Sequence, residues 1–287
     1  MCIRDSSLFI GVSQLSLIDI FHLSDEQINI LFSSRIPRTV SILLSGSSLA
    51  LSGLIMQQMM QNKFVSPTTA GTMEWAKLGI LMSLLFFPNG HILIKLLFAV
   101  VLSIVGTFLF VQLINLIRVK DVIFVPLLGI MIGGILSSFT TFVALRTNAL
   151  QSIGNWLTGN FAVITSGRFE VLYLTIPLLI LAFVFANHFT IAGMGKDFSH
   201  NLGVSYEKII KIALFITATL TALVVVTVGT LPFLGLIVPN IISIYRGDHL
   251  KNALPHTLML GAIFVLIADI IGRIIVYPYE INIGLTI

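Results

Sequence analysis

Three arginines are the residues of this chain best placed to bind an anion. Arg35 and Arg38 flank Pro37 directly before an apolar segment, and Arg273 lies near the end of another apolar segment. A helix start carries a partial positive charge from its aligned peptide dipoles, so cationic side chains are held there at a cost. Anchoring at the membrane interface is the simpler explanation for terminal arginines. The cost also supports a second explanation, in which Arg35, Arg38 and Arg273 meet an anionic partner.

A second candidate stretch, at residues 191–208, is polar and joins two apolar segments. It contains Met194 and Gly195 followed by KDFSHNLGV, which predicts a short helix that ends at Gly203. A solvated connector is one interpretation of this stretch. Its Met, Phe and Leu side chains allow another, in which the short helix docks into a groove of a different protein.

The third candidate stretch, VGTLPFLGLIVPN at residues 228–240, interrupts an apolar segment with glycine and proline. Such breaks free backbone groups, which are tolerated in a membrane only against protein or a water-filled cavity. A simple kink is the alternative, but the clustering of the breaks favours a helix that lines a translocation pathway. The predicted pathway residues are Gly229, Pro232, Gly235, Pro239 and Asn240.

Few ionisable residues fall inside the apolar segments. They are Glu74 with Lys77, Lys95, and Asp269 with Arg273. The spacings of three and four residues predict internal ion pairs, which lower the cost of inserting the charges into a membrane. The alternative is that Glu74 and Asp269 serve as proton-relay or ion-coupling carboxylates.

Signatures of enzymatic chemistry are missing from the sequence. There is no G-x-x-x-x-G-K-[ST] motif to hold the phosphates of ATP, and no H-E-x-x-H motif to hold zinc. No Ser–His–Asp set can be assembled by spacing. The single cysteine, Cys2, excludes an internal disulfide and a cysteine-based metal site. We therefore expect no catalytic residue, no metal site and no cofactor bound by this chain.

The elements that position these stretches are predicted to be membrane-spanning helices. The chain is 56% hydrophobic and only 10% charged, against about 25% charged residues in soluble domains. The net charge of +4 comes from single Lys and Arg residues at the ends of apolar segments, so a nucleic-acid partner is not expected. The composition predicts an all-α, polytopic transmembrane helix bundle that forms one domain over residues 1–287.

The apolar segments predict about eight complete spans. They cover about residues 39–60, 68–87, 91–117, 122–146, 170–190, 207–229, 231–246 and 255–277. The small residues of the first span and the Gly129-x-x-x-Gly133 pair of the fourth predict close helix packing. Residues 13–34 suit a short helix on the membrane surface. We expect one span to be missing at each end of the chain, and residues 1–6 not to be native sequence.

The distribution of basic residues predicts the orientation. If the turn at residues 61–67 is cytoplasmic, every lysine in a loop is cytoplasmic, as the positive-inside rule favours. The basic residues at inner ends are Lys63, Arg118, Lys120, Lys196, Lys208, Lys211, Arg246 and Lys251, and those at outer ends are Arg35, Arg38, Arg146, Arg168 and Arg273. The arginine set then faces outward, and the 191–208 stretch faces the cytoplasm.

Four stretches, in order along nearly the whole chain, resemble a known family. RIPRTVSILLSGSSLALSGLIMQQMMQNKFVSP is similar to R-[LI]-P-R…G…LA-x-SG-x-x-x-Q…N-P-L-x-x-P, and GTLPFLGLIVPNIISIYRGDHLKNALP to G-x-I-G-F-x-G-L-x-x-P-H…G-x-D-H-x-x-x-L-P. MGKDFSHNLGV resembles the coupling segment of that family, and ADIIGR…EINIG resembles its final motif. The family is the membrane subunit of iron-siderophore and vitamin B12 ABC importers. SPTTAGTMEWAKLGIL is similar to the branch that imports ferric catecholate-type siderophores.

The resemblance implies a type II ABC importer permease of about ten helices, in the bacterial cytoplasmic membrane. It implies a homodimer, or a pseudo-homodimer with a related permease, that passes ferric siderophore between its halves by alternating access. Arg35, Arg38 and Arg273 match positions that meet glutamates of an extracytoplasmic siderophore-binding protein. The segment that docks into a P-loop ATPase subunit, where ATP and Mg bind, is matched by Gly193, Met194, Gly195, Lys196, Asp197, Leu202 and Gly203.

The chain departs from the family pattern near the expected inner gate. Lys63 and Phe64 replace Pro and Leu, Asn240 replaces His, Leu231 and Pro232 replace Ile and Gly, and Asn282 replaces Pro.

The function predicted from the resemblance is that of the permease subunit of an ATP-driven importer. An ion-coupled secondary transporter, which would depend on Glu74 or Asp269, is the alternative, and a non-transporting membrane scaffold is a third possibility.

Overall fold

The structure is a computed structural model that describes residues 31–117, 122–164, 167, 169–247, 249–275 and 280–287. Predictions for residues 1–6, for most of the surface helix at 13–34, and for Arg118, Lys120 and Arg168 lie outside this part. Every regular element in the described part is helical, as predicted. The first two elements are η2 (Leu31–Arg35) and α3 (Ile36–Met60). They are followed by α4 (Thr72–Phe86), α5 (Ile92–Leu116), α6 (Phe124–Arg146), α7 (Leu150–Leu157), η3 (Phe169–Leu174), α8 (Thr175–Val184), α9 (Ala186–Gly193), α10 (Lys196–Asn201), α11 (Tyr206–Thr227), α12 (Leu234–Arg246), α13 (Leu250–Ile274) and α14 (Ile283–Thr286).

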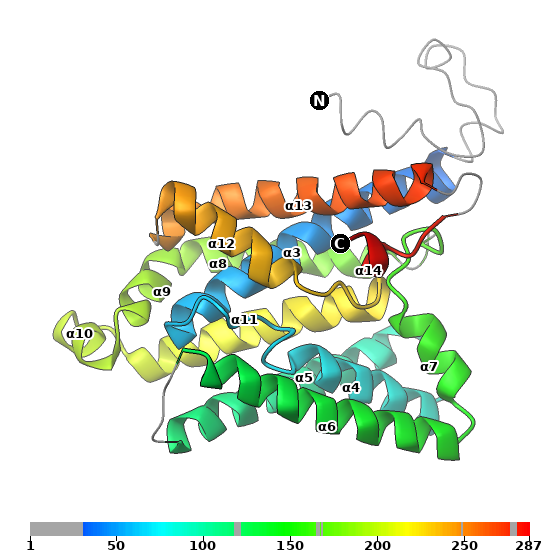
Figure 1. The fold of residues 1–287 in the computed structure, drawn as a ribbon, viewed down its shortest axis with the longest axis horizontal. Coiled ribbons are helices and arrows are strands. Elements are labelled where there is room, and N and C mark those ends of the chain that lie inside the picture. The colour runs from blue at the N-terminus through cyan, green and yellow to red at the C-terminus, as the bar shows by residue number, and fades with distance from the viewer. Residues whose placement is uncertain (1–30, 118–121, 165–166, 168, 248, 276–279) are drawn as a thin grey trace, which may run out of the picture.

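The bundle is built around α3 (Ile36–Met60), which continues from a π-helical turn, η2 (Leu31–Arg35). Pro37 is accepted in the first turn of α3 because its missing N–H has no intrahelical partner there. The helix ends at Gln61 in the left-handed conformation. Figure 1 shows α3 in the middle, with α13 along one side, α11 along the other, and α4, α5 and α6 beyond α11.

Burial confirms that α3 is an interior helix. About 78% of the most apolar window of the η2–α3 helix is buried, against 22% for α6. Buried serines would be costly in such a position, but Ser45 and Ser52 donate to carbonyls four residues earlier, at 2.6 and 2.8 Å. Ser47 donates across the interface to the Leu258 carbonyl on α13 at 3.0 Å. Ser45 and Ser52 therefore satisfy themselves within α3, and Ser47 joins α3 to α13, whereas the buried hydroxyls of Ser41 and Ser48 make no hydrogen bond within the described part.

The described part has fewer complete spans than the eight predicted, and some of the helices are shorter than expected. Five helices in the described part are long and apolar enough to cross a membrane, and a sixth span is formed if η3–α8 and α9, bent by 59°, count as one. The helices expected at 68–87 and 231–246 are shorter, because α4 has 15 residues and α12 has 13. Residues 61–71 form turns held by the side chains of Asn62, Ser66 and Thr69. Apolar residues before α12 are not helical, so hydropathy alone overestimates both helices.

Glycines bring α3 against its neighbours at backbone distance. A Cβ atom on Gly46 would lie 2.5 Å from the Gly261 carbonyl oxygen of α13, and one on Gly53 would lie 1.8 Å from the Gly235 oxygen of α12. A Cβ atom on Gly129 of α6 would lie 2.0 Å from the Thr69 carbonyl oxygen, which confirms the predicted close packing at this glycine. Helices associate in lipid chiefly through such close packing, because lipid is as apolar as their side chains.

This packing predicts that Gly53→Ala is destabilising. The new methyl group would overlap the Gly235 carbonyl, and forced overpacking of this kind costs about 1–3 kcal/mol or more. We expect a lower midpoint of thermal unfolding for the detergent-purified protein. Gly154→Ala is the matched control, since no atom lies within 4 Å of its added Cβ, and an equal loss in both variants would contradict the prediction.

Candidate functional site

The three predicted arginines lie together at one end of the bundle, with two carboxylates among them. Arg38 Nη2 donates to Asp269 Oδ1 of α13 at 2.8 Å, and Arg38 Nη1 donates to Glu280 Oε1 and Oε2 at 2.9 and 2.8 Å. Arg273 Nη2 binds the second oxygen of Asp269. We name Arg35, Arg38, Asp269, Arg273 and Glu280 the outer charge cluster.

The outer charge cluster is buried on one side and open on the other. Arg35, Asp269 and Arg273 are buried, while the side chain of Arg38 is 12% exposed and that of Glu280 is 30% exposed. Its three arginines and two carboxylates carry a formal charge of +1. The Asp269–Arg273 ion pair was predicted from spacing and is confirmed. The bonds of Arg38 to Asp269 and Glu280 were not predicted, because they join residues 231 and 242 positions apart.

The other intramembrane charges are also engaged. Lys77 Nζ lies 2.6 Å from Glu74 Oε1, which confirms the second predicted ion pair. Lys95 Nζ donates to the Gly90 carbonyl at 2.8 Å and lies 5.2 Å from the centre of the Trp156 ring. No group of three His, Cys, Asp or Glu residues in the described part is arranged to hold a metal ion.

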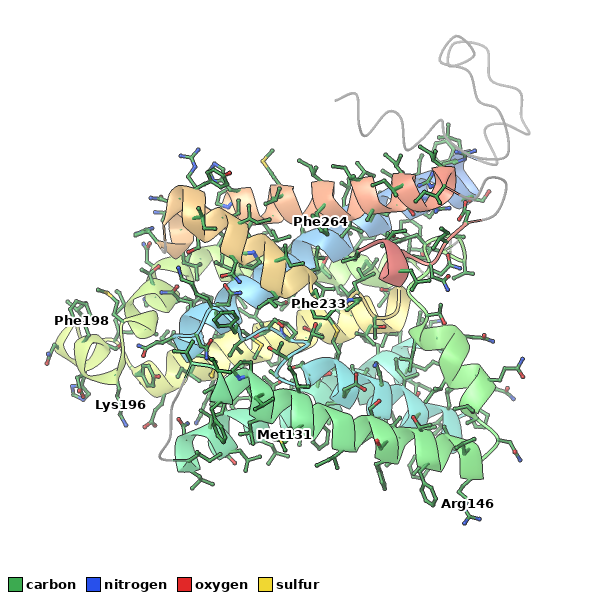
Figure 2. All side chains as sticks on the ribbon, in the orientation of Figure 1. Met131, Arg146, Lys196, Phe198, Phe233 and Phe264 are labelled. Atoms are coloured by element: carbon green, nitrogen blue, oxygen red, sulfur yellow. The ribbon has the colours of Figure 1, made fainter. Side chains whose placement is uncertain are left out.

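The predicted short helix of the 191–208 stretch is present as α10. Gly195 (φ +111°) precedes it and Gly203 (φ +71°) follows it, and the Gly203 N–H closes the last turn on the His200 carbonyl at 3.0 Å. Lys196 and Asp197 lie in the first turn. The apolar side chains of Met194, Phe198 and Leu202 are 56%, 44% and 54% exposed. Figure 2 shows Lys196 and Phe198 at the tip of the bundle far from Arg146, as the predicted orientation requires.

The inner end of α3 contacts this segment directly, which the sequence did not indicate. Gln61 has a left-handed backbone (φ 49°), and its Nε2 donates to the Gly193 carbonyl at 2.9 Å. Gly193 lies against Gln58, so closely that a Cβ atom would be 2.3 Å from Gln58 Nε2. A pocket of about 330 Å³ lies at this joint, lined by Gln57, Gln58, Gln61, Lys63, Met194 and Ser243 among others.

The predicted pathway stretch is a broken helix whose freed backbone groups face protein. Between α11 and α12 the chain passes through Gly229 (φ +99°), Pro232 and Phe233 (φ +60°). Gly229, Gly235 and Pro239 are buried within the bundle. The positive φ of Phe233 is unfavourable for a bulky residue, and its side chain is 54% exposed, near the middle of the bundle in Figure 2. The unusual backbone and exposed side chain of Phe233 were not predicted from the sequence. The role of this stretch in a pathway stays a prediction.

Asn240 and Lys63, two of the residues that differ from the family pattern, are joined by a hydrogen bond. Asn240 Nδ2 donates to the Lys63 carbonyl at 2.9 Å and to the Leu236 carbonyl at 2.8 Å. Lys63 Nζ donates in turn to Ser243 Oγ at 2.8 Å. The turn after α3 is therefore tied to α12 by the side chains of Lys63 and Asn240.

The chain is similar in sequence and in fold to known transport proteins. The FecCD transport family model matches residues 5–287. The chain belongs to this family. It is 55% identical over 282 residues to the petrobactin import system permease protein YclN of Bacillus subtilis, covering 98% of this chain and 89% of the relative. It is 36% identical to the ferric-anguibactin transport system permease protein FatD of Vibrio anguillarum, covering 98% and 90%.

A solved structure has the same fold. An inward-facing metal-chelate type ABC transporter superposes with a TM-score of 0.83 at 24% identity, over 99% of this chain and 91% of the other. Family, relatives and fold together identify the chain as a multi-pass ABC transporter permease. The relatives are permease proteins of transport systems, so the expectation of a transport subunit is correct.

The buried ion pairs predict a strong effect of Asp269→Asn. This change leaves two largely buried guanidinium groups without their shared carboxylate, and breaking a buried pair from one side costs about 3–5 kcal/mol. We expect a clear fall in the thermal unfolding midpoint in detergent. Glu74→Gln removes a partner from a more exposed pair and should cost about 1 kcal/mol or less. Equal effects of the two variants would contradict this ranking.

Proposed function

We propose that this chain is the permease subunit of an ATP-driven, binding-protein-dependent importer that moves a ferric siderophore across the bacterial cytoplasmic membrane. The observation that carries the proposal is that α3 of a FecCD permease joins the outer charge cluster to the exposed α10 segment. The names of the relatives, which refer to petrobactin and ferric anguibactin, support a ferric siderophore as the cargo.

Transport is proposed to proceed by alternating access in a homodimer, or in a pseudo-homodimer with a related permease. The poorly buried α6 leaves an apolar surface for a second copy, with Ile130, Ile135 and Phe139 more than half exposed. An extracytoplasmic siderophore-binding protein docks on Arg35, Arg38 and Arg273 through acidic residues. ATP and Mg bind to partner ATPase subunits on the cytoplasmic side.

In this proposal α10 receives the movement of the ATPase. Its exposed Phe198 and Leu202 enter a groove of the ATPase, and the bond between Gln61 and Gly193 passes the movement to α3. The alternative of an ion-coupled transporter has less support, because Glu74 and Asp269 are both held in ion pairs.

The proposal predicts that the double change Phe198→Asp and Leu202→Asp releases the ATPase. Both side chains are exposed, so the permease itself should stay folded, while two carboxylates would oppose burial in a partner groove. We would purify the protein gently from native membranes and measure the bound P-loop ATPase by mass spectrometry. Lys251→Asp, at an exposed site on the same side of the membrane, is the control and should retain the ATPase. A chain that purifies alone without any substitution would refute the proposal.

The joint at Gln61 predicts a separate uncoupling variant, Gln61→Asn. Asparagine tolerates the left-handed conformation but is one methylene too short to keep the bond to Gly193. We expect siderophore uptake into proteoliposomes to fall about fivefold, because one lost hydrogen bond is worth about 1 kcal/mol, while ATP hydrolysis continues. Gln112→Asn, on the exposed surface of α5, should change neither rate. Parallel loss of uptake and hydrolysis would instead indicate damage to the whole assembly.

A further inference from the structure

The guanidinium of Arg38 is already occupied in the outer charge cluster. Its Nη1 donates to both oxygens of Glu280, and its Nη2 donates to Asp269. A carboxylate of an incoming protein therefore finds both terminal nitrogens already engaged, with only the second N–H of Nη2 unused. It can form a two-bond contact with these terminal nitrogens only by displacing one of the two partners.

The two carboxylates differ in how easily they can be displaced. Asp269 is 4% exposed and also binds Arg273 from the same helix, so its removal would break two largely buried ion pairs at once. Glu280 binds Arg38 alone among the described residues and is 30% exposed. Ion pairs that reach solvent are worth little, because water replaces the lost partner.

The backbone holds Glu280 at this position. The next residue, Ile281, donates its N–H to the Gly272 carbonyl of α13 at 3.1 Å, and Ile283 donates to the Gly159 carbonyl at 3.1 Å. These bonds place Glu280 beside Arg38 in the part of the molecule that the structure describes. The contact is thus a fixed feature of the fold and not a chance meeting of two long side chains.

We propose that Glu280 is an internal competitor that occupies Arg38 until the binding protein docks, and that Asp269 is the positioning residue that holds Arg38 toward the outer surface. The inference rests on the proposed docking role of the arginines. Docking exchanges the Arg38–Glu280 pair for a pair between Arg38 and an acidic residue of the partner. Glu280 therefore lowers the affinity of docking, although it lies within the docking surface.

This exchange predicts effects of opposite sign for two acid-to-amide changes. Glu280→Gln removes the competing charge and should tighten docking about three- to tenfold, the range of one charge-assisted bond at a partly exposed site. Asp269→Asn removes the support of Arg38 and should weaken docking. Simple attraction between an acidic partner and the net charge of the surface would instead predict tighter docking for both variants.

The experiment measures the dissociation constant between the permease in nanodiscs and the purified binding protein of the Bacillus subtilis petrobactin import system, the system of the 55% identical relative. Glu170→Gln is the matched control, because Glu170 lies at the same end of the bundle and binds the Gly167 N–H instead of an arginine. It makes the same change in net charge and should leave the dissociation constant unchanged. Glu280→Asp is the second variant, since its shorter side chain keeps the charge but loses the two-oxygen contact, and it should also tighten docking.

A double-mutant cycle tests whether Glu280 acts through Arg38. Arg38→Gln should weaken docking, and adding Glu280→Gln to it should have no further effect, because the competitor has lost its target. Unchanged or weaker docking in Glu280→Gln, with Arg38→Gln still weakening it, would overturn this inference alone. No effect of Arg38→Gln would overturn the docking role itself, and with it the part of the proposed function on which the inference depends.

Discussion

The backbone contacts of α3 are the constraint on which the rest of the structure depends. In lipid there is little hydrophobic force between helices, so their association requires surfaces that fit closely. Gly46 and Gly53 let α3 approach α13 and α12 so closely that a single Cβ atom would collide with a main-chain carbonyl. These small residues on the contact faces of α3 therefore fix its place at the centre. The two ends of α3 are then held at opposite ends of the bundle.

Each end of α3 bears a contact through which a partner can act on it. A helix of 25 residues spans about 37 Å at 1.5 Å per residue, which exceeds the hydrocarbon thickness of about 30 Å. Arg38 lies in its first turn, and Gln61 directly follows its last turn. In the proposed function, the binding protein and the ATPase would therefore act on opposite ends of the same helix, so that movement of α3 couples them.

Contacts between residues close in sequence could be predicted, and contacts between distant residues could not. The helix stop at Gly203 and the ion pairs Glu74–Lys77 and Asp269–Arg273 follow from spacing along one helix. The bonds from Arg38 to Glu280 and from Gln61 to Gly193 join residues 242 and 132 positions apart, so no local pattern contains them. Hydropathy alone extended the helices into residues 228–233, whereas the glycine and proline residues of this stretch correctly predicted a break.

Two of the departures from the family pattern, Lys63 and Asn240, form one local unit. Lys63 offers its carbonyl to Asn240 and its ammonium to Ser243, so a change at either position alters the same connection between the turn after α3 and α12. The amide of Asn240 also bonds to the Leu236 carbonyl, one turn before it on α12. At the outer end, by contrast, all three arginines of the family motif are kept. Lys63 and Asn240 therefore take part in holding α12 to the turn after α3, at the opposite end of α3 from the outer charge cluster.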